Sequence, residues 1–242
     1  MCEGRVAIVT GAAGNGMGRS IALTLAREGA RVVVNYRTSE DRAQAIVAHV
    51  MSRGGKAFAF RADVTRQDQC RALVDATVEA FGKVDICIIG PGAGWHPEPI
   101  EQLDSNAALD DAQRELAPIY HLLPLVLPGM YDRQWGRVLA IALTAPYNSP
   151  AYAYNVAKAA RTQALLIARD AAWQHGVTVN TIGPGPVPEI ESLERAIEYC
   201  DHGAAWQDRR KPCPQDIAEG IAFLCSPAGD FISGAILPYM FR

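Results

Sequence analysis

Short apolar runs alternate along the chain with longer segments rich in helix-forming residues. Apolar runs with few charges are typical of strands buried on both faces, and they occupy residues 6–9, 31–34, 57–60, 84–89, 138–143 and 177–182. The segments between them favour helices at 18–28, 41–52, 67–81, 109–127 and 153–173. Because such strands, separated by helices, form parallel sheets covered on both sides, we predict an α/β fold with a doubly wound parallel sheet.

Length and composition narrow the class of protein. The 242 residues contain no internal repeat or linker, so we predict one domain over residues 1–242. Apolar residues make up 49% of the chain and charged residues 20%, which excludes disorder, and the net charge of −3 argues against nucleic-acid and membrane partners. The scattered cysteines lack metal-binding spacing, so we expect reduced thiols in a cytoplasmic protein without a metal site.

A glycine-rich turn directly follows the first predicted strand. Residues 10–18 read Thr-Gly-Ala-Ala-Gly-Asn-Gly-Met-Gly, and a helix is predicted after them. Glycine lets a phosphate approach the backbone, and the N-terminus of a helix presents free N–H groups and a positive dipole end. In this strand–turn–helix context a dinucleotide site is favoured over a merely flexible turn. The residues assigned to it are Gly11, Asn15, Gly16, Met17 and Gly18.

The end of the second predicted strand indicates which dinucleotide binds. An NAD site places a carboxylate there for the ribose 2′-hydroxyl, but here the first acid is Glu40. Arg37 can instead bind a 2′-phosphate through charge-assisted hydrogen bonds, with Thr38 or Ser39 adding a hydroxyl. We therefore predict NADP(H) as the cofactor. The alternative is that Arg37 is a solvated side chain at a helix start.

Tyr154 and Lys158 are four residues apart, which places them on one face of a predicted helix. Lowering the pKa of a phenol from ~10 by ~3 units requires about 4 kcal/mol. One ammonium at ~4 Å in an effective dielectric of ~20 supplies about that much. The pair is therefore a candidate general acid–base.

Together these features resemble the short-chain dehydrogenase/reductase family, and within it the group of 3-oxoacyl-carrier-protein reductases. The motifs that carry the resemblance, besides the glycine turn, are Asn35-Tyr-Arg37, Ala62-Asp-Val-Thr65, Gly82-Lys-Val-Asp85, Gly136-Arg-Val138, Tyr154-x-x-x-Lys158, Val179-Asn180 and Pro184-Gly185. The resemblance implies a Rossmann fold with a penultimate helix over 214–226, a last strand over 232–236 and a variable substrate lid at about 189–213. It also implies a homodimer or homotetramer.

The same resemblance implies roles for individual residues. Tyr154 would protonate the oxygen of a small-molecule carbonyl, or accept the proton of an alcohol, while Lys158 would hold the nicotinamide ribose and tune Tyr154. The other cofactor contacts that it implies are Asn35, Asp63, Val64, Gly90, Gly92, Pro184, Gly185 and Val187.

Several positions depart from the family pattern. Residues 89–92 read Ile-Gly-Pro-Gly where the family has Asn-Asn-Ala-Gly. The family's catalytic serine aligns with Leu143, so Thr144 is the candidate that replaces it, with Ser149 as a weaker alternative. Glu115 aligns with an asparagine of the water relay, and Glu189 with a threonine beside the phosphates. The acids in and before the predicted helix that contains Glu115 are expected on a solvated face, and they are Asp104, Asp110, Asp111 and Glu115. Pro118 and Pro124 are expected to kink or split this helix.

Three functions remain open from the sequence. The first is an NADPH-dependent carbonyl reductase, or the reverse alcohol dehydrogenase, with Tyr154 as acid, Lys158 as its tuner and Thr144 as an orienting hydroxyl. The second keeps Tyr154 for elimination, cyclisation or isomerisation without redox chemistry. The third is a catalytically idle binding relative.

Overall fold

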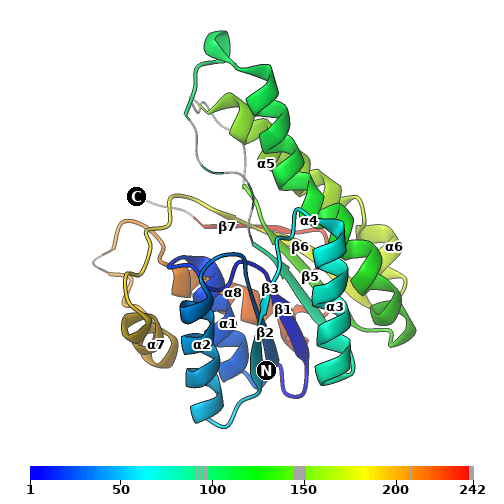
Figure 1. Ribbon diagram of the computed structural model, residues 1–242, viewed down its shortest axis with the longest axis vertical. Helices are drawn as coiled ribbons and strands as arrows, with labels where there is room; N and C mark the ends of the chain where they lie inside the picture. The colour runs from blue at the N-terminus through cyan, green and yellow to red at the C-terminus, as the bar shows by residue number, and fades with distance from the viewer. Residues whose placement is uncertain (91, 93, 95–96, 144–150, 208, 240–242) are drawn as a thin grey trace.

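A computed structural model describes residues 1–242 except 91, 93, 95–96, 144–150, 208 and 240–242 (Figure 1). The described residues form a seven-stranded sheet in the order β3-β2-β1-β4-β5-β6-β7, and every neighbouring pair is parallel. This confirms the predicted doubly wound Rossmann-type sheet. The strands are β1 (Val6–Val9), β2 (Arg31–Tyr36), β3 (Ala57–Arg61), β4 (Ile86–Ile89), β5 (Gly136–Ile141), β6 (Val177–Pro184) and β7 (Ile236–Tyr239).

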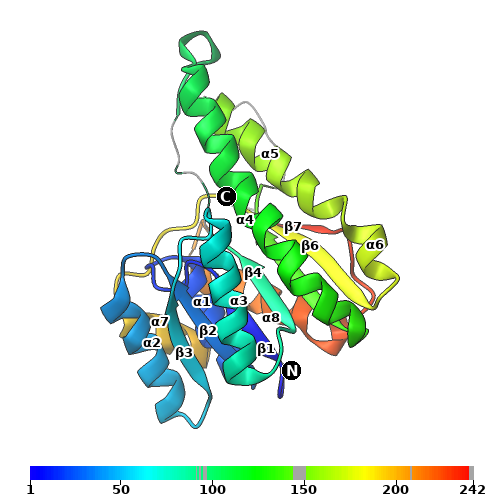
Figure 2. The ribbon, with the colours of Figure 1, turned by 45° about the vertical axis from the view of Figure 1, so that its right-hand side comes forward.

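Two apolar cores lie on opposite faces of the sheet. Along β1, Ala7 and Val9 face one core while Ile8 faces the other, as the alternation of side chains in a strand requires. Helices α1, α2, α7 and α8 pack in the first core and α3, α4, α5 and α6 in the second (Figure 2). The helices are α1 (Met17–Arg27), α2 (Glu40–Ser52), α3 (Gln67–Phe81), α4 (Ser105–Asp132), α5 (Tyr152–Leu166), α6 (Arg169–Trp173), α7 (Leu193–His202) and α8 (Pro214–Cys225), with short 3₁₀ helices η1 (Ile100–Gln102) and η2 (Pro227–Gly229).

Helix α4 is one continuous element, so of the two expected outcomes at Pro118 and Pro124 the split is wrong, whereas a kink stays a prediction. Interior proline removes a helical hydrogen bond, yet Ile119, Leu122 and Val126 of the same helix are buried against the sheet. Their burial stabilises the helical path through the prolines. Helices α4 and α5 pack together and project beyond the end of the sheet in both ribbon views (Figures 1 and 2).

The last strand lies later than expected. Residues 232–235 lie beside β6 without forming a regular strand. Gly234 N donates to Val179 O at 2.7 Å and Thr181 N donates to Ala235 O at 2.9 Å. The buried side chain of Asn180 donates through Nδ2 to Ile232 O at 2.7 Å and accepts through Oδ1 from Ala235 N at 2.9 Å. The strand begins only at Ile236.

The direction of the strand order reverses between β1 and β4, and ligands of doubly wound sheets bind at such a point. Thr10, just after β1, joins the two strand ends: its hydroxyl donates to Ile88 O at 3.0 Å and accepts from Gly90 N at 2.9 Å. The glycine turn therefore lies beside the segment that follows β4. In the described part of the chain, no helix has the length and apolarity needed to span a membrane.

Candidate active site

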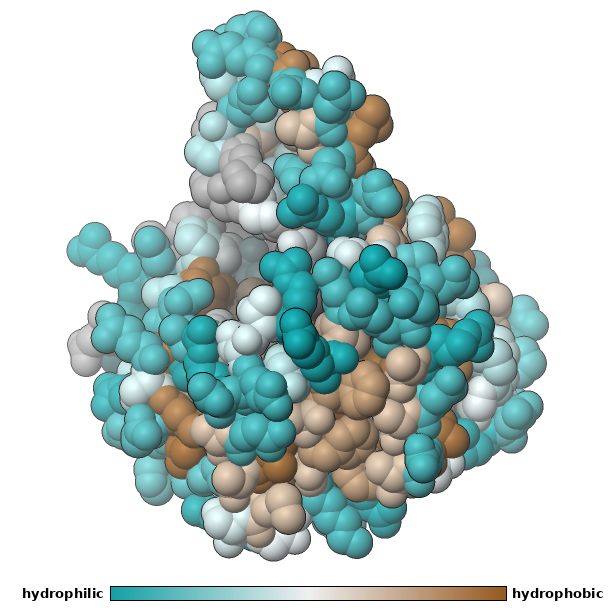
Figure 3. Space-filling model, in the orientation of Figure 1, coloured by the Kyte–Doolittle hydropathy of each residue, from teal (hydrophilic) through white to brown (hydrophobic). Residues whose placement is uncertain are grey.

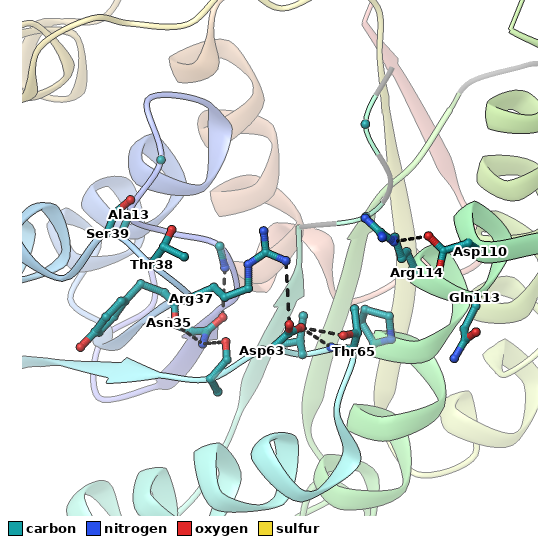
Figure 4. Close-up of a pocket in the computed structure, with 18 residues that line it drawn as sticks. Ala13, Asn35, Arg37, Thr38, Ser39, Asp63, Thr65, Asp110, Gln113 and Arg114 are labelled. Carbon is teal, nitrogen blue, oxygen red and sulfur yellow. Dashed lines mark hydrogen bonds and ion pairs between the residues drawn. The ribbon is translucent and has the colours of Figure 1, made fainter. Parts of the chain in front are cut away.

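A pocket of about 630 Å³ opens where β1, β2 and β3 end (Figure 4). The glycine turn forms one wall, the ends of β2 and β3 form the floor, and the N-terminal half of α4 closes the far side. The lining residues are Gly11, Ala13, Gly14, Asn35, Tyr36, Arg37, Thr38, Ser39, Ala62, Asp63, Val64, Thr65, Gly92, Gly94, Asp110, Gln113, Arg114 and Pro118. The structure thus brings together the residues predicted for the adenosine half of a dinucleotide.

Asn35 braces the glycine turn rather than simply facing the pocket. It is buried, its Oδ1 accepts from Gly11 N at 3.1 Å, and its backbone carbonyl accepts from Ala12 N at 2.8 Å. Its Nδ2 donates to Ala62 O at 3.0 Å, so one amide fixes the turn to both β2 and β3. Gly11 has a φ of 63°, a left-handed conformation that glycine adopts without strain.

The other end of the turn is held by Arg19, which the sequence analysis did not single out. Its buried guanidinium donates to Asn15 Oδ1 at 3.4 Å and to the carbonyl of Ile190, and Ile190 N donates to Asn15 O at 2.9 Å. The segment that leaves β6 at Pro184 and includes Gly185 and Val187 therefore leads directly to the turn. Glu189 is exposed, and its charge partly offsets the lowering of the Arg19 pKa by burial.

The end of β2 presents a cation next to a carboxylate. The exposed guanidinium of Arg37 points towards Asp63, with Nη1 3.8 Å from Oδ2 (Figure 4). Burial alone would raise the pKa of Asp63, but hydrogen bonds from the hydroxyl and N–H of Thr65, together with the charge of Arg37, hold it below its usual value. Asp63 is therefore a carboxylate at neutral pH.

Tyr154 and Lys158 lie on one side of α5, as their spacing predicts, with Lys158 Nζ 5.6 Å from the centre of the Tyr154 ring. The pKa of Tyr154 nevertheless shifts in the direction opposite to the expected one. Burial raises it, the charge of Glu115 raises it further, and Arg161 offsets only part. The expected lowering of the Tyr154 pKa fails because burial is the largest influence and the charge of Glu115 acts in the same direction, while the ammonium of Lys158 is paired with that carboxylate.

Glu115 is fully buried, so the prediction that it lies on a solvated helix face is wrong. Its Oε1 is 2.9 Å from Lys158 Nζ and its Oε2 is 2.9 Å from Arg161 Nη1. The sequence does contain a signal for this: Glu115 lies four residues before Ile119 and seven before Leu122, on the apolar stripe of α4. By contrast Asp110 is exposed and forms a 2.7 Å ion pair with Arg114, and Asp104 caps α4 from the surface.

The remaining predicted positions are distributed around these groups. Gly90 contacts Thr10, and Gly92 lies against the Glu115 carboxylate, where any Cβ would clash. Thr144 lies outside the described residues. Helix α7, within the segment expected to form a lid, packs on α1 and α8 and places Asp201 3.4 Å from Arg53 after α2 (Figure 1). The described residues contain no group of three or more side chains suited to bind a metal.

Comparisons with known proteins agree with this geometry. Residues 5–192 match the family model described as short chain dehydrogenase. The chain is 34% identical over 252 residues to 7alpha-hydroxysteroid dehydrogenase of Escherichia coli K12, covering 97% of this chain and 92% of that protein. It is 30% identical over 235 residues to the 3-oxoacyl-[acyl-carrier-protein] reductase FabG of Staphylococcus epidermidis, covering 94% of each chain.

Solved structures give the same result. A 7 alpha-hydroxysteroid dehydrogenase in complex with NADH and 7-oxo glycochenodeoxycholic acid superposes with a TM-score of 0.84 at 29% identity, over 100% of this chain and 96% of that one. A hydroxysteroid dehydrogenase from Escherichia coli superposes with a TM-score of 0.83 at 32% identity, over 100% and 97% of the two chains.

Proposed function

The chain belongs to the short-chain dehydrogenase family, and from this premise we propose that it is an NADP(H)-dependent oxidoreductase that reduces a small-molecule carbonyl to an alcohol, or catalyses the reverse. One observation carries the proposal: the pocket proposed for the dinucleotide and the ion pair of Lys158 are joined at Gly92. This residue lines the pocket and contacts the carboxylate that binds Lys158. This link supports a cofactor bound beside the proposed acid–base pair.

The residues of the pocket fit a dinucleotide. The first turn of α1, all of it described, contains no acid and begins after Gly16, so its N-terminal N–H groups suit a pyrophosphate. Pro184, Gly185 and Val187 at the end of β6 would border the nicotinamide, as would Gly90 and Gly92 after β4. Asp63 and Val64 would flank the adenine.

The exposed guanidinium of Arg37 supports NADP(H) over NAD(H). It lies at the mouth of the pocket where a 2′-phosphate requires a cation, and Thr38 beside it adds a hydroxyl. Asp63 is the competing feature, because a carboxylate suits an unphosphorylated ribose. Its pairing with Arg37 reduces that competition.

In the proposed reaction the cofactor, when bound, supplies a hydride to the carbonyl carbon. Tyr154 donates its hydroxyl proton to the carbonyl oxygen, and the raised pKa of Tyr154 keeps that proton in place at neutral pH. Lys158 would hold the nicotinamide ribose beside Tyr154. We also propose that Thr144 orients the substrate oxygen, since a threonine hydroxyl both donates and accepts.

A thermal-shift measurement followed by a turnover assay tests the function. Cofactor at ~100 times its dissociation constant stabilises a protein by about 2.7 kcal/mol, which at this size raises Tm by roughly 5–11 °C. We expect a larger shift with NADP(H) than with NAD(H), and NADPH oxidation with at least one member of a panel that includes a 7-oxo bile acid and a 3-oxoacyl thioester. A shift without turnover would favour non-redox chemistry, and no shift with either cofactor would favour the idle binding relative.

We further propose a cytoplasmic homodimer or homotetramer. All six cysteines are buried free thiols, which suits a reducing compartment. The projecting α4–α5 pair exposes large apolar side chains, and Figure 3 shows apolar residues along its right-hand edge in an otherwise polar surface. The large side chains that α4 and α5 expose include Leu109, Tyr120, Tyr152 and Val156. Analytical ultracentrifugation would measure the assembly.

A further inference from the structure

Two buried cations share one buried carboxylate next to Tyr154. The side chains of Glu115 and Arg161 are completely inaccessible and that of Lys158 is 8% exposed. Both ion-pair distances to Glu115 are 2.9 Å, one for each carboxylate oxygen. A buried ion costs several kcal/mol unless it is paired, so the carboxylate is what allows two positive charges in this space.

The position of the carboxylate is fixed from several sides. Arg161 Nη2 donates to Ile89 O at 2.6 Å and approaches Gly90 O at 3.4 Å, which ties the guanidinium to the end of β4. Gly92 leaves room for the carboxylate, because a side chain at that position would occupy the same space. The ion pairs therefore link α4, α5 and the end of β4 at the proposed site.

The charge of Lys158 depends on a balance between these groups. Burial and the repulsion of Arg161 lower its pKa to about 8, whereas Glu115 raises it. From α5, Tyr154 and Arg161 face Lys158, and from α4 Glu115 does. Strand β6 also packs on α5, and it has no titratable side chain.

We propose that Glu115 is a positioning residue for the proposed carbonyl reduction: it keeps Lys158 charged and in place beside Tyr154, against the repulsion of Arg161. The inference rests on the proposed function, because the charge of Lys158 acts there by placing the cofactor ribose beside Tyr154. Glu115 thus acts through Lys158. Arg161 repels Lys158, and it also pairs with the Glu115 carboxylate and holds it in position.

The pH dependence of kcat/KM for reduction tests this balance through opposite shifts. We expect the alkaline limb of the wild-type profile near pH 8, where Lys158 loses its proton. Glu115→Gln removes the attraction and moves the limb to lower pH by about 1–3 units, whereas Arg161→Gln removes the repulsion and moves it upward. Glu115→Asp keeps the charge and restores most of the wild-type profile. Asp132→Asn, an exposed acid at the end of the same helix, leaves the limb in place.

A general loss of packing would move the alkaline limbs of Glu115→Gln and Arg161→Gln in the same direction, or would move neither. Either result overturns the proposal. Should Glu115→Gln fail to fold, the upward shift in Arg161→Gln decides by itself, and its absence overturns the proposal.

Lysine NMR separates this inference from the proposed function. The lysines of the chain are Lys56, Lys83, Lys158 and Lys211, so ¹³Cε-labelled lysine gives a readily assigned spectrum in which Lys158 titrates without cofactor or turnover. Opposite pKa shifts of Lys158 in Glu115→Gln and Arg161→Gln support the charge balance even where no carbonyl is reduced, a result that would overturn the proposed function alone. Unchanged titration of Lys158 in both variants overturns the inference even where the enzyme reduces carbonyls.

Discussion

The half-buried phenol of Tyr154 has a raised pKa, so at neutral pH it carries the proton that a carbonyl reduction consumes. We expect Tyr154→Phe to lower kcat for reduction by about 10²–10⁴-fold, because phenylalanine keeps the ring but has no proton to donate. The dissociation constant of the cofactor should remain nearly unchanged. Steady-state kinetics and cofactor titration measure the two effects separately.

The matched control for this prediction is Tyr152→Phe, two residues earlier on α5, where the side chain is exposed. It should leave kcat unchanged. Activity retained in Tyr154→Phe would remove Tyr154 from the proposed chemistry.

Arg37 carries the preference between the two dinucleotides. Arg37→Ala removes the cation proposed for the 2′-phosphate, and a charged hydrogen bond at such an exposed position is worth about tenfold in affinity. We expect the dissociation constant of NADPH to rise by about that factor while that of NADH stays the same. Isothermal titration calorimetry measures both.

Arg53→Ala serves as the control, because Arg53 is an equally exposed arginine that pairs with Asp201 outside the dinucleotide pocket. Equal loss of both cofactors in Arg37→Ala, or a wild-type protein that prefers NADH, would show that Asp63 rather than Arg37 determines the choice.

At the residue scale, local motifs predicted what lies close in sequence. The glycine turn, Arg37 and the Tyr154–Lys158 spacing were recognisable because neighbours in a turn or on one helix face are neighbours in space. The sequence did not predict the partner of Lys158, because Glu115 lies on another helix. Glu115 also follows the acids Asp110 and Asp111 in the sequence, so it was expected to be solvated like them. Only tertiary packing shows that it pairs with two buried cations.

At the element scale, α4 combines interior prolines with an unbroken helical path. Pro124 is exposed, so its ring contributes little to the core while its missing N–H weakens the helix. We expect Pro124→Ala to stabilise the protein by up to about 2 kcal/mol, after allowing for the greater entropy of the unfolded chain, and to raise Tm by up to about 8 °C. Differential scanning calorimetry measures the change.

Pro227→Ala is the comparison, since Pro227 is an exposed proline at the first position of η2, where its fixed φ is favourable. This variant should gain no stability. A Tm of Pro124→Ala that equals or falls below that of the wild type would contradict the idea that the interior proline weakens α4.

The hydrophobic pattern predicted the elements that are buried in the core. It did not predict boundaries that depend on local hydrogen bonds. The run at 6–9 matches β1, because a strand buried on both faces must be apolar throughout. The helix expected at 153–173 is two helices, since the chain leaves α5 after Leu166 and starts α6 at Arg169. The segment before β7 mixes backbone bonds to β6 with side-chain bonds from Asn180, and no periodicity in the sequence reveals where its regular pairing begins.

At the scale of the whole molecule, the cysteines report on global opening. All six are buried and free, and burial raises the pKa of Cys70 and of Cys87 to about 12, so neither access nor thiolate is available in the folded state. We expect iodoacetamide to modify them only through unfolding, at a rate that follows the population of the open protein. Mass spectrometry of peptides gives the rate for each cysteine.

Cofactor binding turns this rate into a test of coupling between the pocket and the two cores. NADP(H) at ~100 times its dissociation constant lowers the unfolded population about 100-fold, so thiols that react through global unfolding should slow by that factor. Cys70 and Cys87 lie in the core that is covered by α3, α4, α5 and α6. Cys200 and Cys225 lie in the core on the other face of the sheet, which is covered by α1, α2, α7 and α8. Because both cores share one sheet, all four should slow together. A cysteine that reacts at the same rate with and without cofactor would instead identify a part of the fold that opens independently of the dinucleotide pocket.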